Sequence, residues 1–193
     1  MIANIGYGGL LVAFAVALYG IAAAIYGALK KNDRVAESAR LAMLLTFPLV
    51  SVSVIALLIL LISGRYEYAY VYNVTSSAMP LYLKITALWG GQDGSLLFWS
   101  WLLSAFTTAV TLRKWDRDRE FLPWVVAVSL ATLAFFLILS LFVDNPFERF
   151  FMGADGGEIL AMFQPASTFA ITPPDGRGLN PLLRHPGMII HPP

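Results

Sequence analysis

Cysteine is absent from this chain of 193 residues, and histidine occurs only twice, as His185 and His191. Without cysteine the chain forms no disulfide bond of its own and carries no thiol for redox or nucleophilic chemistry. Structural zinc sites take four ligands, drawn mostly from cysteine and histidine. Two histidines do not complete such a site, so we expect no structural zinc within one chain.

Charged residues are scarce as well, at 13% of the chain, whereas soluble domains carry about 25%. The formal net charge at pH 7 is +1, which provides no basic excess for a nucleic-acid partner. Hydrophobic residues make up 58% of the chain, above the share of about 45–50% in soluble domains. Because this excess is concentrated in a few runs, it indicates an integral membrane protein rather than a large soluble core.

Four uncharged apolar runs are present, at residues 5–29, 41–62, 95–112 and 122–143. A helix that spans a bilayer needs about 20 apolar residues, and each run is long enough. Backbone polar groups in lipid must be satisfied within the segment, which favours helices over open strands. We therefore predict an all-α polytopic membrane protein, with a four-helix transmembrane region over residues 1–143 and an irregular extracytoplasmic tail over residues 144–193.

The loops predict the orientation of these helices. Basic residues are concentrated in the first and third loops, as Lys30, Lys31, Arg34, Arg40, Arg113, Lys114, Arg117 and Arg119. The second loop, residues 63–94, holds only Arg65 and Lys84. Since cytoplasmic loops collect Lys and Arg, we predict that the first and third loops are cytoplasmic. The N-terminus, residues 63–94 and residues 144–193 are then extracytoplasmic. No basic region precedes the first run, so we expect a retained helix rather than a signal peptide.

The second loop ends in a polar, glycine-rich hexapeptide between two tryptophans. This hexapeptide, residues 90–95, includes Gly90, Gly91 and Asp93. Trp89 precedes it, and Trp99 follows within the next apolar run. Glycines allow a tight turn and a close backbone approach. One interpretation is the start of a helix, capped by a polar side chain (Asp93 or Ser95) and flanked by an interfacial aromatic belt. The other is a surface for a flat, amphipathic ligand.

Two features of the second loop carry further predictions. Residues 81–89 are predicted to form a short helix lying in the membrane interface. Upstream, four tyrosines alternate with other residues, and an extended segment would place all of them on one face: Tyr66, Tyr68, Tyr70 and Tyr72. We interpret these tyrosines as interfacial anchors.

The two histidines differ in their surroundings. His185 is expected to be an ordinary surface residue. His191 follows an apolar stretch and precedes Pro192 and Pro193, whose rings fix the backbone. Imidazole is the commonest metal ligand among side chains, so His191 is a candidate ligand for a metal or cofactor. An exposed histidine without a ligand remains the alternative.

Three motifs together carry a resemblance to a known family. They are Leu-Trp-Gly-Gly-Gln-Asp-Gly-Ser-Leu-Leu-Phe-Trp at residues 88–99, Asn-Pro-Phe-Glu-Arg at residues 145–149, and the closing run at residues 178–193. In order and position they look like the N-terminal part of CcmF-type cytochrome c haem lyases. The resemblance extends over essentially all 193 residues.

The resemblance implies a role in covalent haem attachment. Members of this family take haem from a membrane-tethered haem chaperone and attach it to a Cys-x-x-Cys-His site of apocytochrome c, outside the cytoplasmic (inner) membrane. His191 matches the first of two histidines that ligate the haem iron. Trp89, Gly90, Gly91, Asp93 and Trp99 match the family motif and are candidates for cofactor binding. The substrate supplies both thiols, so no catalytic nucleophile is expected in this chain.

The family pattern continues beyond this sequence. Further helices, a tryptophan-rich loop, the second outer histidine and two membrane histidines that hold a resident haem b have no counterpart in these 193 residues. We therefore expect a part of a larger lyase, inactive alone, with membrane lipid, haem chaperone, apocytochrome c and other maturation subunits as partners. A non-catalytic scaffold of the maturation machinery is the alternative. A small transporter is disfavoured, because the four runs lack the charges that mark ion pathways.

Overall fold

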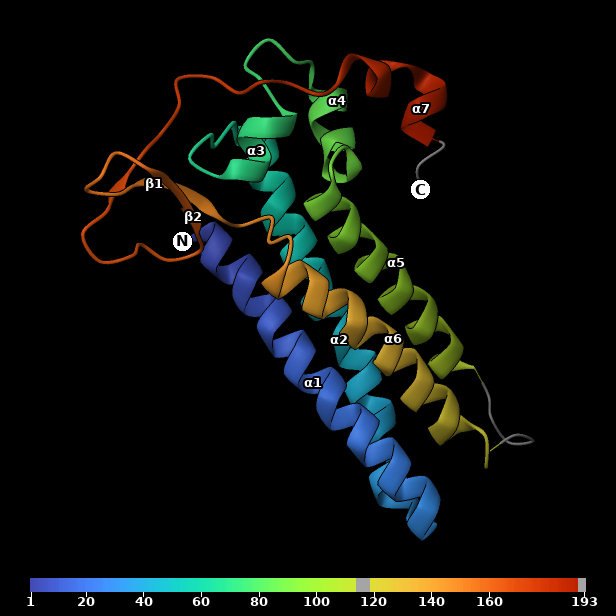
Figure 1. Cartoon of the computed structure of the whole chain (residues 1–193). Coiled ribbons are helices and arrows are strands. Elements are labelled where there is room, and N and C mark those ends of the chain that lie inside the picture. Colours follow the sequence, from blue (N-terminus) through green and yellow to red (C-terminus); the bar gives the residue numbers. More distant parts are fainter. Residues whose placement is uncertain (114–118, 191–193) are drawn as a thin grey trace.

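The computed structural model describes residues 1–113 and 119–190 of the chain, and His191 lies outside this part. Four long helices lie side by side along most of their length (Figure 1): α1 (Ile2–Lys30), α2 (Asp33–Ser63), α5 (Gln92–Leu112) and α6 (Leu122–Phe142). Each is long and apolar enough to cross a membrane. The predicted four-helix membrane region is confirmed, and the structure extends α1 and α2 beyond the predicted spans.

The helix ends follow local signals. Lys31 ends α1 in a left-handed conformation with φ 50°, and Asn32 then caps α2 by accepting a hydrogen bond from Val35 N at 3.3 Å. Pro123 lies in the first turn of α6, where the N–H that proline lacks would have had no intrahelical partner. The turn between α1 and α2 is therefore tight, and the two helices form an antiparallel pair.

Small residues bring α1 and α2 close together. A Cβ atom on Gly27 would lie 2.7 Å from the backbone nitrogen of Ala36, so only glycine fits at this crossing. Near the other end of the pair, the Ser53 hydroxyl donates to the carbonyl oxygen of Gly6 at 2.7 Å. Small residues and interhelical hydrogen bonds are the usual means of packing helices in lipid, where no hydrophobic force drives association.

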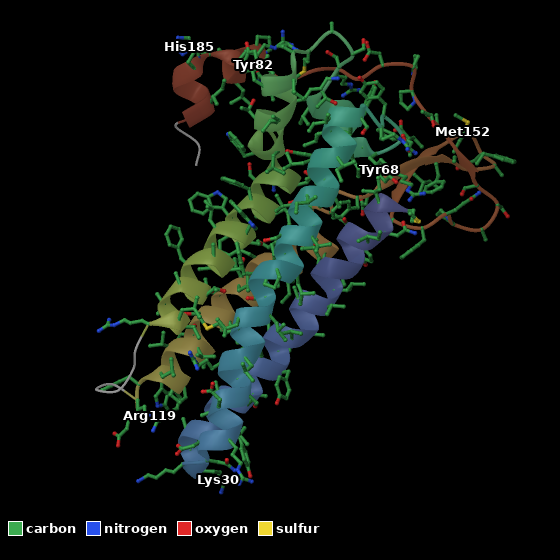
Figure 2. All side chains as sticks on the ribbon, turned by 180° about the vertical axis from the view of Figure 1, so that it is seen from behind. Lys30, Tyr68, Tyr82, Arg119, Met152 and His185 are labelled. Atoms are coloured by element: carbon green, nitrogen blue, oxygen red, sulfur yellow. The ribbon has the colours of Figure 1, made fainter. Side chains whose placement is uncertain are left out.

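Short elements cover one end of the bundle, which we call the sheet end. They include α3 (Ala69–Val74), α4 (Leu81–Thr86) and the 3-10 helix η1 (Ala87–Trp89). The last two confirm the predicted helix over residues 81–89. Figure 2 shows Tyr68, Tyr82 and His185 at this end, and Lys30 and Arg119 at the opposite end, which we call the basic end.

The interpretation of the four tyrosines as interfacial anchors is wrong. Tyr66, Tyr68 and Tyr70 are buried within the protein, and Tyr72 is half-buried. Because α3 begins at Ala69, the segment is not extended throughout and the four rings do not share one face. Tyr66, Tyr68 and Tyr72 contact the tail, far away in sequence, whereas Tyr70 is buried against the turn that precedes α5.

The tail is more regular than predicted. It forms a three-stranded antiparallel sheet in the order β2-β1-β3, from β1 (Arg149–Met152), β2 (Glu158–Ala161) and β3 (Phe169–Ala170). The turn between β1 and β2 closes with a hydrogen bond from Gly153 N to Gly157 O at 2.8 Å. Residues 171–180 are an irregular loop, followed by the 3-10 helix η2 (Pro181–Arg184) and α7 (Pro186–Ile190).

Candidate functional site

The three sequence motifs meet at the sheet end of the bundle. The amide Nε2 of Gln92, in the first motif, donates to Asp144 Oδ2 beside the second motif at 2.8 Å. The indole nitrogen of Trp89 donates to the carbonyl oxygen of Ile189, in the third motif, at 3.0 Å. Segments that are far apart in sequence therefore form one continuous region around the first turn of α5.

The glycines of the first motif serve close packing. A side chain on Gly94 would collide with the carbonyl oxygen of Leu88 and the hydroxyl of Tyr70, and a Cβ atom on Gly91 would lie 3.0 Å from the Tyr70 ring. A Cβ atom on Gly90 would press against Leu179 of the tail. These glycines let α3 and the tail lie directly on the turn that precedes α5.

Tyr70 organises this turn. Its hydroxyl, which is fully buried, donates to the carbonyl oxygens of Ala87 at 2.7 Å and Leu88 at 3.1 Å. Burial raises the pKa of the Tyr70 phenol well above its ordinary value, and the negative charge of Asp93 adds to the shift. The phenol therefore remains a neutral donor and holds η1 against α3.

An aromatic row runs from the motif along α5 towards α2. The ring centroids of Trp89 and Phe98 are 5.1 Å apart, those of Phe98 and Trp101 are 5.9 Å apart and nearly parallel, and those of Trp101 and Phe47 are 6.1 Å apart. The Trp101 indole nitrogen donates to the Ser51 hydroxyl at 2.9 Å. All four rings are only partly buried, so the row presents an apolar, aromatic surface suited to a flat ligand.

The second motif anchors the tail on the bundle. Asn145 Oδ1 accepts a hydrogen bond from Phe147 N at 3.0 Å, which turns the chain, and the Phe147 ring is fully buried against Gly6 of α1. Two residues later, the Arg149 guanidinium lies 5.0 Å from the centre of the Tyr68 ring and donates to Asn4 Oδ1 at 3.1 Å. The motif thus sets the direction in which β1 leaves the membrane region.

Three carboxylates at this end lie close enough to influence one another. Asp93, Asp144 and Glu148 are all partly buried. Burial raises the pKa of Glu148, and the charges of Asp93 and Asp144 raise it further. Within residues 1–113 and 119–190, no group of three or more histidine, cysteine or acidic side chains is arranged to hold a metal ion.

Residues 173–179, which we call the strap, tie the tail to the segment after α3. The Asp175 carboxylate accepts hydrogen bonds from Ser77 N at 2.7 Å and Ser77 Oγ at 2.6 Å. These bonds, above all that from the hydroxyl, lower the pKa of Asp175 to about 2. Backbone bonds from Arg177 N to Tyr72 O at 2.8 Å and from Gly178 N to Thr75 O at 3.0 Å continue the attachment.

The structure brings together most of the predicted site residues. Trp89, Gly90, Gly91 and Asp93 lie in the first turn of α5 or just before it, whereas Trp99 is 45% exposed and takes no part in the aromatic row. His185 is exposed, as expected, and its Nδ1 accepts a bond from Gly187 N at 3.2 Å.

One local prediction about the motif is wrong. Neither Asp93 nor Ser95 caps α5, because the helix begins one residue after Gly91, which occupies the cap position without a side-chain bond. The Ser95 hydroxyl instead donates to the carbonyl oxygen of Trp89 at 3.0 Å. Sequence reasoning also missed Phe98 and Trp101, although their spacing of three residues places them on neighbouring positions of one helix face.

Comparison with known proteins is consistent with these motifs. The family described as "Cytochrome C assembly protein" matches residues 89–193. Over all 193 residues the chain is 31% identical to the cytochrome c-type biogenesis protein CcmF of Haemophilus influenzae and 30% identical to that of Escherichia coli. The chain spans 27% of the length of each of these two relatives.

A solved structure shares the fold. The chain is similar to a cytochrome c heme lyase CcmF, with a TM-score of 0.70 and 24% identity, over 76% of this chain and 25% of that one. The arrangement of the helices is therefore one already seen in a chain of about three times this length.

Proposed function

The chain belongs to the cytochrome c assembly protein family, and we propose that it forms the part of a cytochrome c haem lyase against which haem is held as a substrate. Haem attachment adds each thiol of the apocytochrome across a haem vinyl group. The substrate thus supplies the nucleophile, and the protein has to position the macrocycle. This role agrees with a chain that has no cysteine.

The hydrogen bond between Trp89 and Ile189 carries this proposal. It joins α7 to the aromatic row of Trp89, Phe98 and Trp101 at a distance of 3.0 Å. His191 follows Ile189 by two positions in the sequence. We propose that the His191 imidazole ligates the haem iron and that the row supports one face of the porphyrin, since flat aromatic systems stack favourably on such rings.

Other haem ligands are proposed to come from elsewhere. The described part of the chain contains one histidine, His185, and it is exposed at the outer surface. A second axial ligand and the ligands of any resident haem b therefore have to be supplied by the rest of a longer protein or by a partner chain. The haem chaperone, the apocytochrome c and other maturation subunits are the proposed partners.

We propose that the sheet end faces outward from the cytoplasmic membrane and the basic end faces the cytoplasm. Supporting this orientation, the turn at residues 31–32 between α1 and α2 and residues 119–121 before α6 lie at the basic end, where Figure 2 shows Lys30 and Arg119. Cytoplasmic loops collect basic residues. Haem and apocytochrome would then meet the three motifs on the extracytoplasmic side.

Replacing His191 with alanine in the intact maturation system tests the proposal. We expect the yield of holocytochrome c to fall by about tenfold or more, because even the loss of a residue that only orients a metal ligand typically costs 10–100-fold. His185→Ala is the matched control, because this histidine is exposed and lies six positions away. Both variants have to accumulate in the membrane, which an immunoblot checks. Normal yield from His191→Ala would favour a non-catalytic scaffold and refute the haem-ligand role.

A further inference from the structure

A second feature of the molecule lies at the basic end, far from the three motifs. A cavity of about 450 Å³ opens between the end of α1, the start of α2 and the start of α6. Its apolar part is formed by the helix ends themselves, at Gly27, Ala28, Leu122 and Pro123. The proposed haem site does not use this cavity, because Arg119 on its lining lies at the opposite end of the bundle from Tyr68 and Tyr82 (Figure 2).

Charges of both signs surround the cavity. Lys31 and Arg119 contribute two positive charges, and Asp33 and Glu120 contribute two negative charges. Among the described residues, none of these four side chains takes part in a salt bridge or a side-chain hydrogen bond. A third carboxylate on the lining, that of Glu37, is already paired with Arg40 at 2.8 Å. Four charged groups therefore remain available to a ligand.

The cavity lies at the ends of two candidate membrane spans. It is located where the spans of α1 and α6 end and begin, at Lys30 and Leu122. Trp124 lines it and is 45% exposed, and the neighbouring Phe121 is 66% exposed. Exposed aromatic rings at a span end are typical of the depth of lipid headgroups. An occupant with an apolar part can therefore enter from the lipid side.

We propose that this cavity binds the headgroup of a zwitterionic phospholipid with a primary ammonium group, as in phosphatidylethanolamine. Lys31 and Arg119 bind the phosphate, which also lies near the positive end of the α2 dipole. Asp33 and Glu120 accept hydrogen bonds from the ammonium, which has three N–H donors. The acyl chains then lie along Trp124 and the lipid-facing side of α6.

The charge pattern selects among lipids. Phosphatidylglycerol carries a net negative charge and offers no ammonium, so its headgroup leaves Asp33 and Glu120 without a partner. Phosphatidylcholine has a quaternary ammonium without N–H donors, and quaternary ammonium groups are usually held by several aromatic rings. Among the residues that the structure describes, one aromatic side chain lines the cavity, that of Trp124. Phosphatidylethanolamine is the headgroup that matches both pairs of charges.

Titration of the full chain in detergent with each of the three lipids tests the proposal by native mass spectrometry. We expect one tightly bound phosphatidylethanolamine and weaker binding of the other two lipids. The double variant Lys31→Ala/Arg119→Ala should bind it at least about tenfold more weakly, because charge-assisted hydrogen bonds to the phosphate are lost. Asp33→Asn/Glu120→Gln should remove the preference over phosphatidylglycerol while the phosphate contacts remain.

The control variant is Lys30→Ala/Arg34→Ala. It removes two positive charges at the same end, from exposed residues that do not line the cavity, and should bind lipid like the unchanged chain. Equal binding of phosphatidylglycerol by the unchanged chain, or an equal effect of the control variant, would overturn the proposal. Displacement of the lipid by equimolar soluble O-phosphoethanolamine would also overturn it, since the site would then bind the headgroup without the lipid.

Discussion

The Trp89 indole nitrogen donates a hydrogen bond to the carbonyl oxygen of Ile189 at 3.0 Å, across 100 residues of sequence. This bond joins the glycine-rich turn before α5 to the last helix that the structure describes. The bond places the backbone of Ile189, near the end of the tail, next to the aromatic row. The proposed haem site depends on this long-range contact, whereas the lipid cavity at the basic end is independent of it.

Loss of the Phe147 ring should destabilise the fold. The ring is fully buried against Gly6, so Phe147→Ala leaves a cavity at the point where the tail meets α1. We expect a loss of about 3–5 kcal/mol in the free energy of unfolding, seen as a lower melting temperature in detergent. Phe169→Ala is the control, because that ring is 72% exposed. Equal melting temperatures for the two variants would contradict the packing role of Phe147.

Gly94→Ala should lower the stability of the fold, although alanine favours helices more than glycine does. A methyl group at this position meets the Leu88 carbonyl oxygen and the Tyr70 hydroxyl, so α3 or the turn before α5 has to move. Gly8→Ala in α1 has nothing within 4 Å and should stabilise its helix by up to about 1 kcal/mol. A lower melting temperature for Gly94→Ala and a higher one for Gly8→Ala would support the close packing at Gly94. An unchanged melting temperature for Gly94→Ala would refute it.

The Tyr70 hydroxyl should contribute to stability in a pH-dependent way. Tyr70→Phe leaves the Leu88 carbonyl oxygen without its hydrogen bond and should cost about 1–3 kcal/mol near pH 8. Burial raises the folded-state pKa of this phenol above the ordinary value of about 10. Its contribution is therefore complete below pH 10 and decreases as the pH rises further, because only the unfolded state ionises there.

Denaturation of the unchanged chain and Tyr70→Phe at pH 8 and pH 11 measures this difference. The difference in the free energy of unfolding between the unchanged chain and Tyr70→Phe should be smaller at pH 11 than at pH 8. Tyr82→Phe serves as the control, since that ring is 61% exposed and should leave stability unchanged at both pH values. A gap that stays constant would mean that Tyr70 ionises normally in the folded protein.

The Asp175 carboxylate should hold the strap in place only while it is ionised. Its pKa is lowered to about 2, mainly by the hydrogen bond from the Ser77 hydroxyl. The folded-state pKa is below the unfolded value of about 3.9, so its contribution is complete above about pH 4 and is lost as the pH falls towards 2. Asp175→Ala should speed amide hydrogen exchange at Ser77 and Gly178 at neutral pH.

The control for the strap is Asp155→Ala. That carboxylate accepts a bond from Gly157 N within its own turn and makes no contact with the strap. Exchange at Ser77 and Gly178 should therefore remain slow in this variant. If Asp155→Ala and Asp175→Ala speed exchange equally, the effect comes from the loss of negative charge rather than from the bonds to Ser77.

The four spans were predictable because each depends on one local property, an uncharged apolar run of sufficient length. The helix over residues 81–89 was also predictable from its local sequence. The sheet was not, since β1 and β3 are joined only after a connection of 16 residues, from 153 to 168. The tyrosines were wrongly predicted to be interfacial anchors, because alternation along the sequence does not show which other segment packs over them.

The sequence by itself determined that this chain lies in a membrane, where its four long helices run, and where the chemically distinctive residues are found. These properties follow from composition and neighbouring residues. Only the tertiary structure decided that Gly94 faces Tyr70, that Phe147 fills the space beside Gly6, and that Trp89 contacts Ile189. Such contacts join residues separated by 24 to 141 positions, so they depend on how the helices pack and cannot be read from local patterns.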